Sequence, residues 1–460
     1  MYKVQHCMIS DRSSWIYEYC DRYAILSWHL YNAALFRIRQ IFTGWDKECL
    51  TPNEKEVFDE VSVLEESFPS IRVRRVISYT HLEKLMRVTH SPDFFSGLPM
   101  QTSQAVVRQA VTDFKNWLAS VREYKKEPGS FLGRPGMPRY KKSACTFTMT
   151  NQDAVLYPDG LKLPCTKNRV WLSCVVQGVL KEVKVVPCYG RYILSLTFET
   201  PDVPAPSCGS HVAAIDFGTD NIAAIVCTDG SSKLYKGGAI LSENRYFAME
   251  RARLSGIITK GHAHVCAHSR QLDSLSFHHA NFVKDQLHKI SSDIVKYCLQ
   301  HGAGTLVLGE NRFWKQGCRI GNSNNQSFIM MPVSFLKKLI EYKACNSGIT
   351  VIRQEESYTS KASFVDGDYI PVYGTDDENA VFSGRRIRRG LYRTSGGILV
   401  NADLNAAANI LKKAMPCAWD VLFDGSVCPS HRYDFLIFPE VSGFHELNPQ
   451  GIPVKGIAAA

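Results

Sequence analysis

The sequence predicts a multidomain chain that joins an all-β part to an α/β part. Three observations support this fold class. Apolar residues recur at helical spacing between residues 13 and 41 and again between 101 and 124. Short apolar runs separated by turn residues fill positions 145 to 200, and from residue 211 strands alternate with helices. The 460 residues suffice for two or three domains of ordinary size.

The composition is ordinary for a soluble globular protein, with 45% hydrophobic and 21% charged residues. Because no run of about eighteen apolar residues occurs, we expect no transmembrane helix and no membrane partner. The first residues do not have the layout of a signal peptide. An excess of 54 Lys and Arg over 44 Asp and Glu gives a net charge of +10, which weakly favours polyanionic partners.

The 15 cysteines are scattered and odd in number, which favours a reducing cytoplasm and free thiols over disulfides. Since no two of them have the CxxC spacing, we expect no cysteine-based zinc site.

The N-terminal part is expected to be helical. The helix over residues 13–41 is either a plain amphipathic helix or one that faces nucleic acid, and the sequence leaves both interpretations open. Shorter helical patches follow near 53–66 and 81–89. The helix over 101–124 is clearer, and it carries Gln104 and Arg108 on its solvent side.

A basic loop follows this helix. Its three prolines and three glycines between residues 125 and 142 exclude regular structure. Arg134, Arg139 and Lys141 are among its basic residues, and a rigid basic loop with aromatic residues suits phosphate backbones. The alternative is a solvated linker.

Residues 145–200 contain short strands without an intervening helix, which indicates a small β-barrel or sandwich. The proline-rich stretch 201–210 is expected to link it to the next domain. From residue 211 the order of elements is β-β-β-α-β-α-β-α, which is typical of the ribonuclease-H-like fold. In that fold the first strand is central and the fourth strand pairs beside it in parallel.

Three acidic residues in this α/β part each stand at the end of a strand or at the start of a helix. Asp216 and Glu310 end apolar strands, and Asp403 follows Asn401 at the start of a helix. Adjacent strands lie about 4.8 Å apart, so the first two carboxylates are expected to face one another. Three hard oxygen ligands suit Mg²⁺ or Mn²⁺, and two such ions can hydrolyse a phosphodiester. The alternative is three ordinary strand-end or capping residues.

Several motifs resemble TnpB, the transposon-encoded OrfB protein that is related to the type V CRISPR effector nucleases. The resemblance runs from about residue 20 to about 413. Its most specific parts are Glu-Ser-Tyr-Thr-Ser-Lys at 356–361 and Asn-Ala-Asp-x-Asn-Ala at 401–406. Further matching segments are 30–34, 133–141, 325–328 and 341–343.

The resemblance implies a RuvC-like nuclease domain and a wedge-type β-barrel domain that carries an inserted helical recognition domain. The corresponding ranges are 1–20 and 143–205 for the wedge, 21–142 for the recognition domain, 206–355 and 395–435 for the nuclease, 356–394 for a target-binding insertion and 436–460 for a loosely ordered tail.

The resemblance also implies the activity. It indicates a cytoplasmic, nucleoid-associated prokaryotic enzyme that uses a guide RNA to find DNA beside a short flanking motif and cuts it at Asp216, Glu310 and Asp403. The expected partners are therefore a guide RNA, double-stranded DNA and the single strands that unwinding produces. Gln104, Arg108 and Asn151 are the candidates for reading the flanking motif.

The chain departs from many TnpB proteins in having no four-cysteine zinc ribbon: no cysteine lies between 346 and 416, and Ala362 stands at one place where a cysteine is often found. We expect a metal-free insertion whose arginines contact phosphate. Its acidic residues, Asp366 and Asp368 and the group at 376–378, would pair with these arginines, or the segment would be a solvated charged hairpin. The arginines are Arg385, Arg386, Arg388, Arg389 and Arg393.

Three functions remain open on the sequence. The first is an RNA-guided, Mg²⁺-dependent DNA endonuclease. The second is an RNA-guided repressor of the same fold that has lost cleavage, and the third is a nuclease that needs no guide. The guide itself is either a transposon-end RNA or a CRISPR RNA, as in a type V effector.

Overall fold

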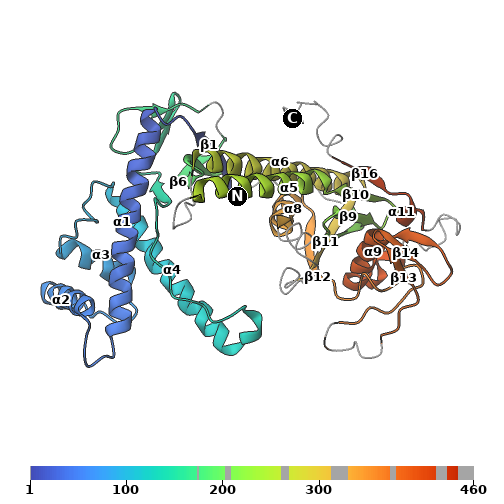
Figure 1. Cartoon of the computed structure of the whole chain (residues 1–460), viewed down its shortest axis with the longest axis horizontal. Coiled ribbons are helices and arrows are strands. Elements are labelled where there is room, and N and C mark those ends of the chain that lie inside the picture. Colours follow the sequence, from blue (N-terminus) through green and yellow to red (C-terminus); the bar gives the residue numbers. More distant parts are fainter. Residues whose placement is uncertain are drawn as a thin grey trace. The chain divides into compact units, whose positions relative to one another are not determined.

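The computed structural model divides the chain into two compact units, Met1–Asp202 and Val203–Ala460 (Figure 1). The described residues are 2–172, 176–201, 209–260, 269–311, 330–372, 374, 380–420 and 433–443. The motif at 325–328, the acidic group at 376–378 and residues 444–460 lie outside them. The two units are described separately.

Helices make up most of the first half of the first unit, as the apolar periodicity predicts. They are α1 (Trp15–Gly44), α2 (Pro52–Ser67), α3 (Tyr79–Val88), α4 (Met100–Lys126) and the short 3-10 helix η1 (Pro128–Ser130). Thr51 and Glu54 form a capping box at the start of α2, which satisfies backbone amides that no helical carbonyl reaches. Helix α1 packs against α4, and the Tyr31 hydroxyl donates to Asp113 Oδ2 at 2.7 Å between them.

The strands of this unit form two antiparallel sheets. The larger has the order β1-β7-β6-β2, and Tyr2 at its edge is paired with Glu199. Buried and half-buried residues alternate along β7, so one face of the sheet covers a core that is continuous with the helices. The second sheet has the order β3-β4-β5. The strands are β1 (Tyr2–Ile9), β2 (Phe147–Thr150), β3 (Val155–Tyr157), β4 (Gly160–Lys162), β5 (Arg169–Val170), β6 (Val179–Cys188) and β7 (Arg191–Glu199).

The second unit is built on a sheet whose described strands have the order β12-β11-β8-β9-β10-β16. Strand β8 pairs in parallel with β11, and β11 in parallel with β12, while β8, β9 and β10 form an antiparallel meander. The prediction that the first strand is central, with the fourth parallel beside it, is confirmed. The strands are β8 (His211–Asp216), β9 (Asn221–Cys227), β10 (Ser232–Lys236), β11 (Ala303–Glu310), β12 (Thr350–Glu355) and β16 (Glu440–Ser442).

Strand β16 corrects the expectation of a loosely ordered tail for residues 436–443, the part of that tail which the structure describes. Its three residues pair in parallel with β10, with Lys233 opposite Glu440. The pairing covers backbone groups that the edge of the sheet would otherwise leave exposed.

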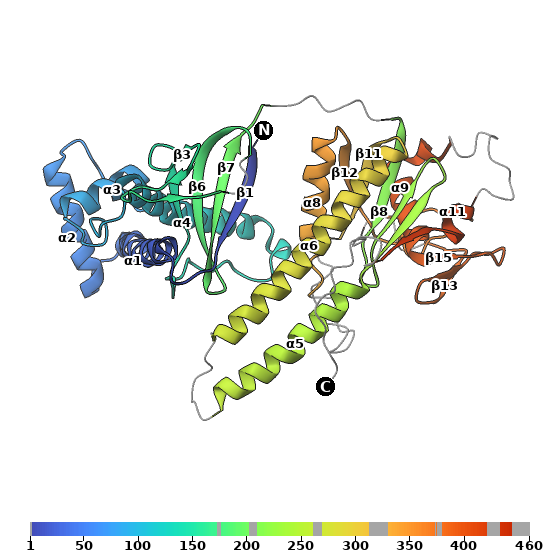
Figure 2. The same ribbon diagram turned by 90° about the horizontal axis from the view of Figure 1, so that it is seen from above.

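Helices cover both faces of this sheet (Figure 2). Ile215 and Leu308 pack on the face of α6 and α8, whereas Ala214 and Val307 pack on the face of α9. This alternation follows from the pleat, because successive side chains of a strand point to opposite faces. The helices are α5 (Gly238–Thr259), α6 (Arg270–Gln300), α8 (Val333–Asn346), α9 (Ala402–Ala414), the short 3-10 helix η2 (Pro416–Trp419) and α11 (Asp434–Ile437).

A small antiparallel sheet with the order β13-β14-β15 precedes α9. Its strands are β13 (Arg385–Arg388), β14 (Leu391–Arg393) and β15 (Leu399–Asn401). Strands β13 and β14 form a hairpin that carries all five predicted arginines, which we call the arginine hairpin (residues 385–393). In the part of the chain that the structure describes, no helix is long and apolar enough to cross a membrane.

Candidate active site

Asp216 ends the central strand β8. Val212 and Ala214 point to the α9 face of the sheet, so the pleat directs Asp216 to that same face. The next residues form the turn into β9, whose first residue, Asn221, contacts Asp403 near the start of α9. The carboxylate of Asp216 is therefore presented to α9 and not to α6 or α8.

Asp403 lies in the first turn of α9. The Asn401 side chain caps this helix, because its Oδ1 accepts from the amides of Asp403 at 2.9 Å and Leu404 at 3.1 Å. Ala406 and Ala407 are buried, and such small residues let the helix approach the sheet closely. The cap thus sets the position from which the Asp403 carboxylate reaches the end of β8.

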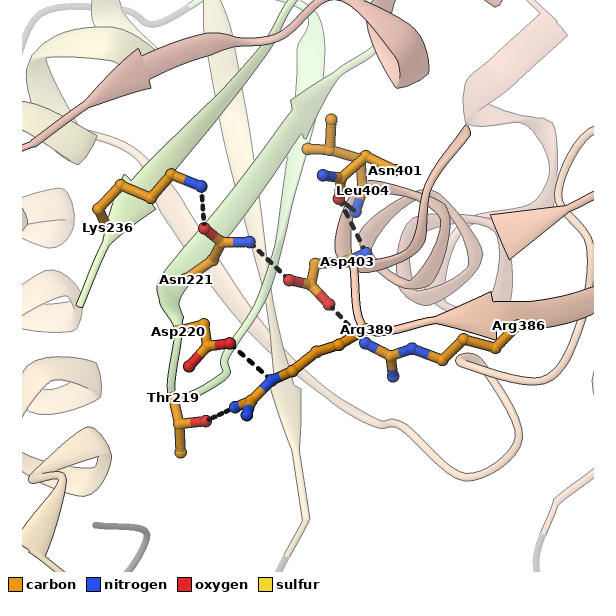
Figure 3. Close-up of polar contacts among 9 residues, drawn as sticks. All are labelled: Thr219, Asp220, Asn221, Lys236, Arg386, Arg389, Asn401, Asp403 and Leu404. Atoms are coloured by element: carbon orange, nitrogen blue, oxygen red, sulfur yellow. Dashed lines mark hydrogen bonds and ion pairs between the residues drawn. The ribbon is translucent and has the colours of Figure 1, made fainter. Parts of the chain in front are cut away.

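Both oxygens of Asp403 have partners (Figure 3). Its Oδ2 accepts from Asn221 Nδ2 at 2.7 Å, and Lys236 Nζ donates to Asn221 Oδ1 at 2.9 Å. Its Oδ1 forms an ion pair with Arg386 Nη2 at 3.4 Å. Asn221 and Lys236 were not predicted, although they begin β9 and end β10, the two predicted strands that follow Asp216 along the chain.

A cavity of about 880 Å³ opens where these elements meet. Asp216 and Asp403 both line it, so the structure brings these two predicted residues together. Other polar residues around it are Thr219, Asp220, Asn221, Lys236, Ser360, Arg386, Arg389 and Asn401.

The pKa of Asp216 is raised well above its ordinary value. Burial is the main cause, since a desolvated carboxylate resists ionisation, and the negative charges of Glu356 and Asp403 add to it. Arg386 and Lys337 oppose the shift. Asp216 as a residue is half-buried and lines the cavity, so a cation bound there would offset the negative charge that burial and the neighbouring acids disfavour.

The structure places Glu310 differently. Leu306 and Leu308 face α6 and α8, so Glu310 follows them to that face of the sheet. There its carboxylate pairs with Arg353 at 3.0 Å, and Arg353 also binds Glu341 of α8 at 2.6 Å. Glu310 does not line the cavity. Among the described residues, no three Asp, Glu, His or Cys side chains are arranged closely enough to hold a metal ion.

Glu356 is an acid near Asp216 that the sequence analysis did not select. It follows β12, the third of the parallel strands. A Cβ on Gly309 would lie 2.7 Å from Glu356 Oε2 and 3.2 Å from the Ile215 carbonyl oxygen, so the carboxylate crosses β11 over this glycine. The pKa of Glu356 is raised, mainly by burial. The sequence did contain a signal for Glu356, since it directly follows Glu355, the last residue of a strand parallel to β11.

Lys337 of α8 reaches the same place from the other side of the sheet end. Its Nζ donates to the Gly309 carbonyl and lies 4.8 Å from the centre of the Phe217 ring. Burial lowers the pKa of Lys337, although the charges of Glu356 and Glu310 oppose this. Lys337 is thus a cation set among the acids of the site.

Two arginines of the arginine hairpin contact the site. Arg386 pairs with Asp403, as described above. Arg389 binds Asp220 Oδ2 at 2.6 Å through Nε and donates to Thr219 Oγ1 at 2.9 Å through Nη2. Arg385, Arg388 and Arg393 are exposed and do not line the cavity.

Of the acids proposed to pair with the arginines of the insertion, the structure describes Asp366 and Asp368, and neither of the two does so. Asp366 accepts from the amide of Ser395 at 3.0 Å. Asp368 accepts from the amides of Ser363 at 2.7 Å and Ser383 at 3.1 Å. These carboxylates therefore organise the backbone of the insertion, because short polar side chains readily cap nearby amides.

In the first unit the basic loop is anchored to its neighbours rather than forming a free linker. The Lys141 carbonyl accepts from Trp28 Nε1 at 2.6 Å and from Asn32 Nδ2 at 2.9 Å, and Trp117 Nε1 donates to the Pro135 carbonyl at 3.0 Å. Lys141 Nζ lies 3.8 Å from the centre of a tyrosine ring of α1. The side chains of Arg134 and Arg139 are exposed.

The three residues proposed to read the flanking motif contact residues outside the basic loop. Gln104 donates to Glu83 at 3.2 Å, and the Arg108 guanidinium lies 4.6 Å from the centre of the Tyr79 ring. The Asn151 side chain is exposed, while its amide donates to the Lys181 carbonyl at 3.1 Å.

The chain is similar to transposon-encoded and CRISPR-associated proteins. Residues 195–314 match the OrfB_IS605 probable transposase family, and residues 334–410 match the Cas12f1-like TNB domain. The TnpB-like protein ORF457 of Acidianus two-tailed virus is 28% identical over 215 residues, which are 45% of this chain and 42% of that protein. The chain is therefore related to the TnpB proteins and the type V CRISPR effectors.

Solved structures of such effectors also resemble the chain. A Cas12f1–sgRNA–target DNA complex matches with a TM-score of 0.48 and 13% identity, over 86% of this chain and 82% of that one. The C2c1 protein of Alicyclobacillus acidoterrestris in complex with single-guide RNA matches with a TM-score of 0.27 and 12% identity, over 89% of this chain and 33% of that one.

Proposed function

We propose that the chain is an RNA-guided DNA endonuclease of the TnpB type, which cleaves target DNA beside a short flanking motif. The observation that carries the proposal is the meeting of Asp216 and Asp403 in one cavity, beside the arginine hairpin. Two carboxylates with an adjacent pair of guanidinium groups can receive both metal ions and a phosphodiester.

The sheet supports the assignment of a ribonuclease-H-like, RuvC-like nuclease fold. Its order β12-β11-β8-β9-β10, with β8 parallel to β11, is the arrangement that this fold requires. Ligands of such sheets bind at the carboxyl ends of parallel strands. Asp216 and Glu310 end β8 and β11, and Asp403 approaches the same edge from α9.

We extend the assignment to the rest of the chain on the relation to TnpB. Residues 1–20 and 143–205 would form the wedge domain, 21–142 the recognition domain and 206–355 with 395–435 the nuclease. Residues 356–394 would bind the target strand.

The donors at the site suit Mg²⁺ or Mn²⁺, because hard cations prefer carboxylate oxygens and complete their shell with water and phosphate. Asp216 and Asp403 would hold the ions, and Glu310, at the end of the neighbouring strand, is the third candidate ligand, although its carboxylate pairs with Arg353 in this structure. When bound, the ions would activate the attacking water and stabilise the departing oxygen. Asn221 keeps the Asp403 carboxylate turned toward the cavity, and Lys337 offsets part of the negative charge.

Guide RNA and DNA would bind through phosphate contacts and stacking. Arg134, Arg139 and Lys141 of the basic loop, with Arg385, Arg388 and Arg393 of the hairpin, offer charge for this purpose. The matched Cas12f1 structure is described as a complex with sgRNA and target DNA, which is consistent with such partners.

The test uses the full chain purified with its coexpressed RNA, Mg²⁺ and a library of targets with varied flanking sequence. Asp216→Asn should lose cleavage by about 10³-fold or more while still binding target, because a neutral amide is a poor ligand for Mg²⁺. Asp285→Asn is the matched control, since Asp285 pairs with Lys289 on the surface of α6.

Each alternative gives a different result in this test. Target binding without cleavage by the unaltered chain would identify a repressor. Cleavage that persists after the RNA is removed would identify a nuclease that needs no guide. Sequencing of the copurified RNA would separate a transposon-end guide from a CRISPR RNA.

A further inference from the structure

The partners of Asp403 differ in how firmly they are held. Asn221 is 7% exposed, and its own Oδ1 accepts from Lys236. Burial and this second hydrogen bond therefore hold the Asn221 side chain, which donates to Oδ2 of Asp403. Arg386 reaches Oδ1 at 3.4 Å, and its side chain is 45% exposed. Exposed ion pairs contribute little stability, so the contact of Asp403 with Arg386 breaks more easily than the contact with Asn221.

A cation that binds Asp403 must use an oxygen atom. Oδ2 accepts the hydrogen bond from Asn221, so Oδ1 is the oxygen more easily made available to a metal ion. In this structure Oδ1 is bound by Arg386. A guanidinium and a divalent ion compete for the same oxygen through their like charges. Arg386 therefore opposes metal binding whenever it stays on Asp403.

Arg389 keeps the arginine hairpin in reach of the site. It binds both Asp220 and Thr219, which belong to the turn between Asp216 and Asn221. The hairpin is thus attached to the loop that follows β8, and a departure of Arg386 from Asp403 need not detach the hairpin.

We propose that Arg386 is a phosphate-responsive counter-ion of the active site. Without nucleic acid it neutralises Asp403 and weakens metal binding. When a strand enters, a backbone phosphate takes the guanidinium, for which phosphate is a strong bidentate partner, and Oδ1 becomes free for the metal. Metal and strand then bind cooperatively, and the coupling is reciprocal. This inference rests on the proposed nuclease function.

The test measures Mn²⁺ binding to the full chain, freed of RNA, from the electron paramagnetic resonance of unbound Mn²⁺. Mn²⁺ binding that is lost in the Asp403→Asn variant is assigned to the proposed active site. Arg386→Gln should bind Mn²⁺ roughly two- to fivefold more tightly than the unaltered chain, the range expected for losing an exposed ion pair. Arg388→Gln removes the same charge from an exposed position of the same strand that does not line the cavity, and it should change the affinity less.

A second arm adds a saturating single-stranded deoxyoligonucleotide with non-hydrolysable linkages. The unaltered chain should then gain Mn²⁺ affinity, whereas Arg386→Gln should gain less and should bind the strand more weakly. A variant that binds metal better but DNA worse is not explained by damage to the fold.

The outcomes separate the two proposals. If Asp403→Asn abolishes Mn²⁺ binding but Arg386→Gln equals Arg388→Gln, the counter-ion role is wrong and the metal site stands. If Asp403→Asn leaves Mn²⁺ binding unchanged, both the proposed metal site and the inference built on it are wrong.

Discussion

Asn221 and Asp403 are 182 positions apart, yet Nδ2 of the first donates to Oδ2 of the second at 2.7 Å. The bond ties the first residue of β9 to the first turn of α9, and both residues line the cavity together with Asp216. An amide held this way selects one orientation of the carboxylate, as hydrogen-bonding partners of metal ligands commonly do.

Asn221→Ala should therefore raise the Mg²⁺ concentration for half-maximal cleavage by about tenfold, since loss of such a partner costs roughly 10- to 100-fold in metal affinity. The measurement is cleavage rate against Mg²⁺, with a melting curve to show that the variant is folded. An unchanged Mg²⁺ requirement in a folded variant would contradict the positioning role.

The raised pKa of Asp216 has a consequence for stability. A carboxyl whose folded pKa lies above its unfolded value of 3.8 binds more protons when folded, so the free energy of unfolding falls as pH rises from about that value through the folded pKa. In Asp216→Asn the amide does not ionise, so the free energy of unfolding no longer falls with pH for this reason. The metal-free variant should be more stable than the unaltered chain at pH 7, with a gap that shrinks toward pH 4.

Melting curves in EDTA at several pH values measure this gap. Added Mg²⁺ should stabilise the unaltered chain and not the variant, because only the carboxylate binds the ion. A variant that melts lower than the unaltered chain in EDTA at pH 7 would contradict the prediction.

The order of the elements was predictable because the second unit obeys local rules. Buried parallel strands are continuous apolar runs, and helices show the three- and four-residue spacing. Strand β16 was not predictable in this way. Its residues Glu440–Ser442 have no apolar pattern of their own, and they become a strand only because the edge of β10 is available.

The site was predicted in part. Asp216 and Asp403 meet as expected, but strand spacing alone did not place Glu310. The pleat would have placed it, since Glu310 has the parity of Leu306 and Leu308 and thus faces α8. The contacts of Asn221 with Lys236 and of Arg386 with Asp403 depend on side-chain conformation, which no spacing rule contains.

Gly309 is the residue that lets Glu356 pass over β11. A Cβ there would also lie 2.8 Å from Ile410 Cδ1, so Gly309→Ala overpacks the junction of sheet and helix. We expect a loss of about 1–3 kcal/mol of unfolding free energy. Gly256→Ala, with nothing within 4 Å, should instead stabilise α5 by about 0.5–1 kcal/mol.

Denaturant titration of the two glycine variants gives both values. The prediction for Gly309 is that the change also lowers cleavage beyond the loss of folded protein, since Glu356 borders this position and its charge acts on Asp216. Equal and small effects of the two substitutions would contradict it.

Glu356→Gln tests the unpredicted acid. It should raise the Mg²⁺ requirement by roughly three- to tenfold, because a nearby negative charge strengthens cation binding by on the order of 1 kcal/mol. Glu355→Gln is the matched control, since the neighbouring carboxylate pairs with Lys413 at 2.6 Å, whereas Glu356 is the negative charge with the largest effect on the pKa of Asp216. If both variants need the same Mg²⁺ as the unaltered chain, Glu356 has no electrostatic part in the site.

The basic loop makes a prediction about salt. Its anchoring by Trp28, Asn32 and Trp117 holds the backbone, while Arg134 and Arg139 remain exposed. Each phosphate contact releases counter-ions, and it contributes about 0.7 to the slope of log affinity against log salt for a single strand and about 0.9 for a duplex. The Arg134→Gln, Arg139→Gln double variant should therefore bind nucleic acid with a slope reduced by about 1.4–1.8. Lys55→Gln, which removes an exposed charge on α2, serves as the control, and equal slopes in all three proteins would show that the loop does not contact phosphate.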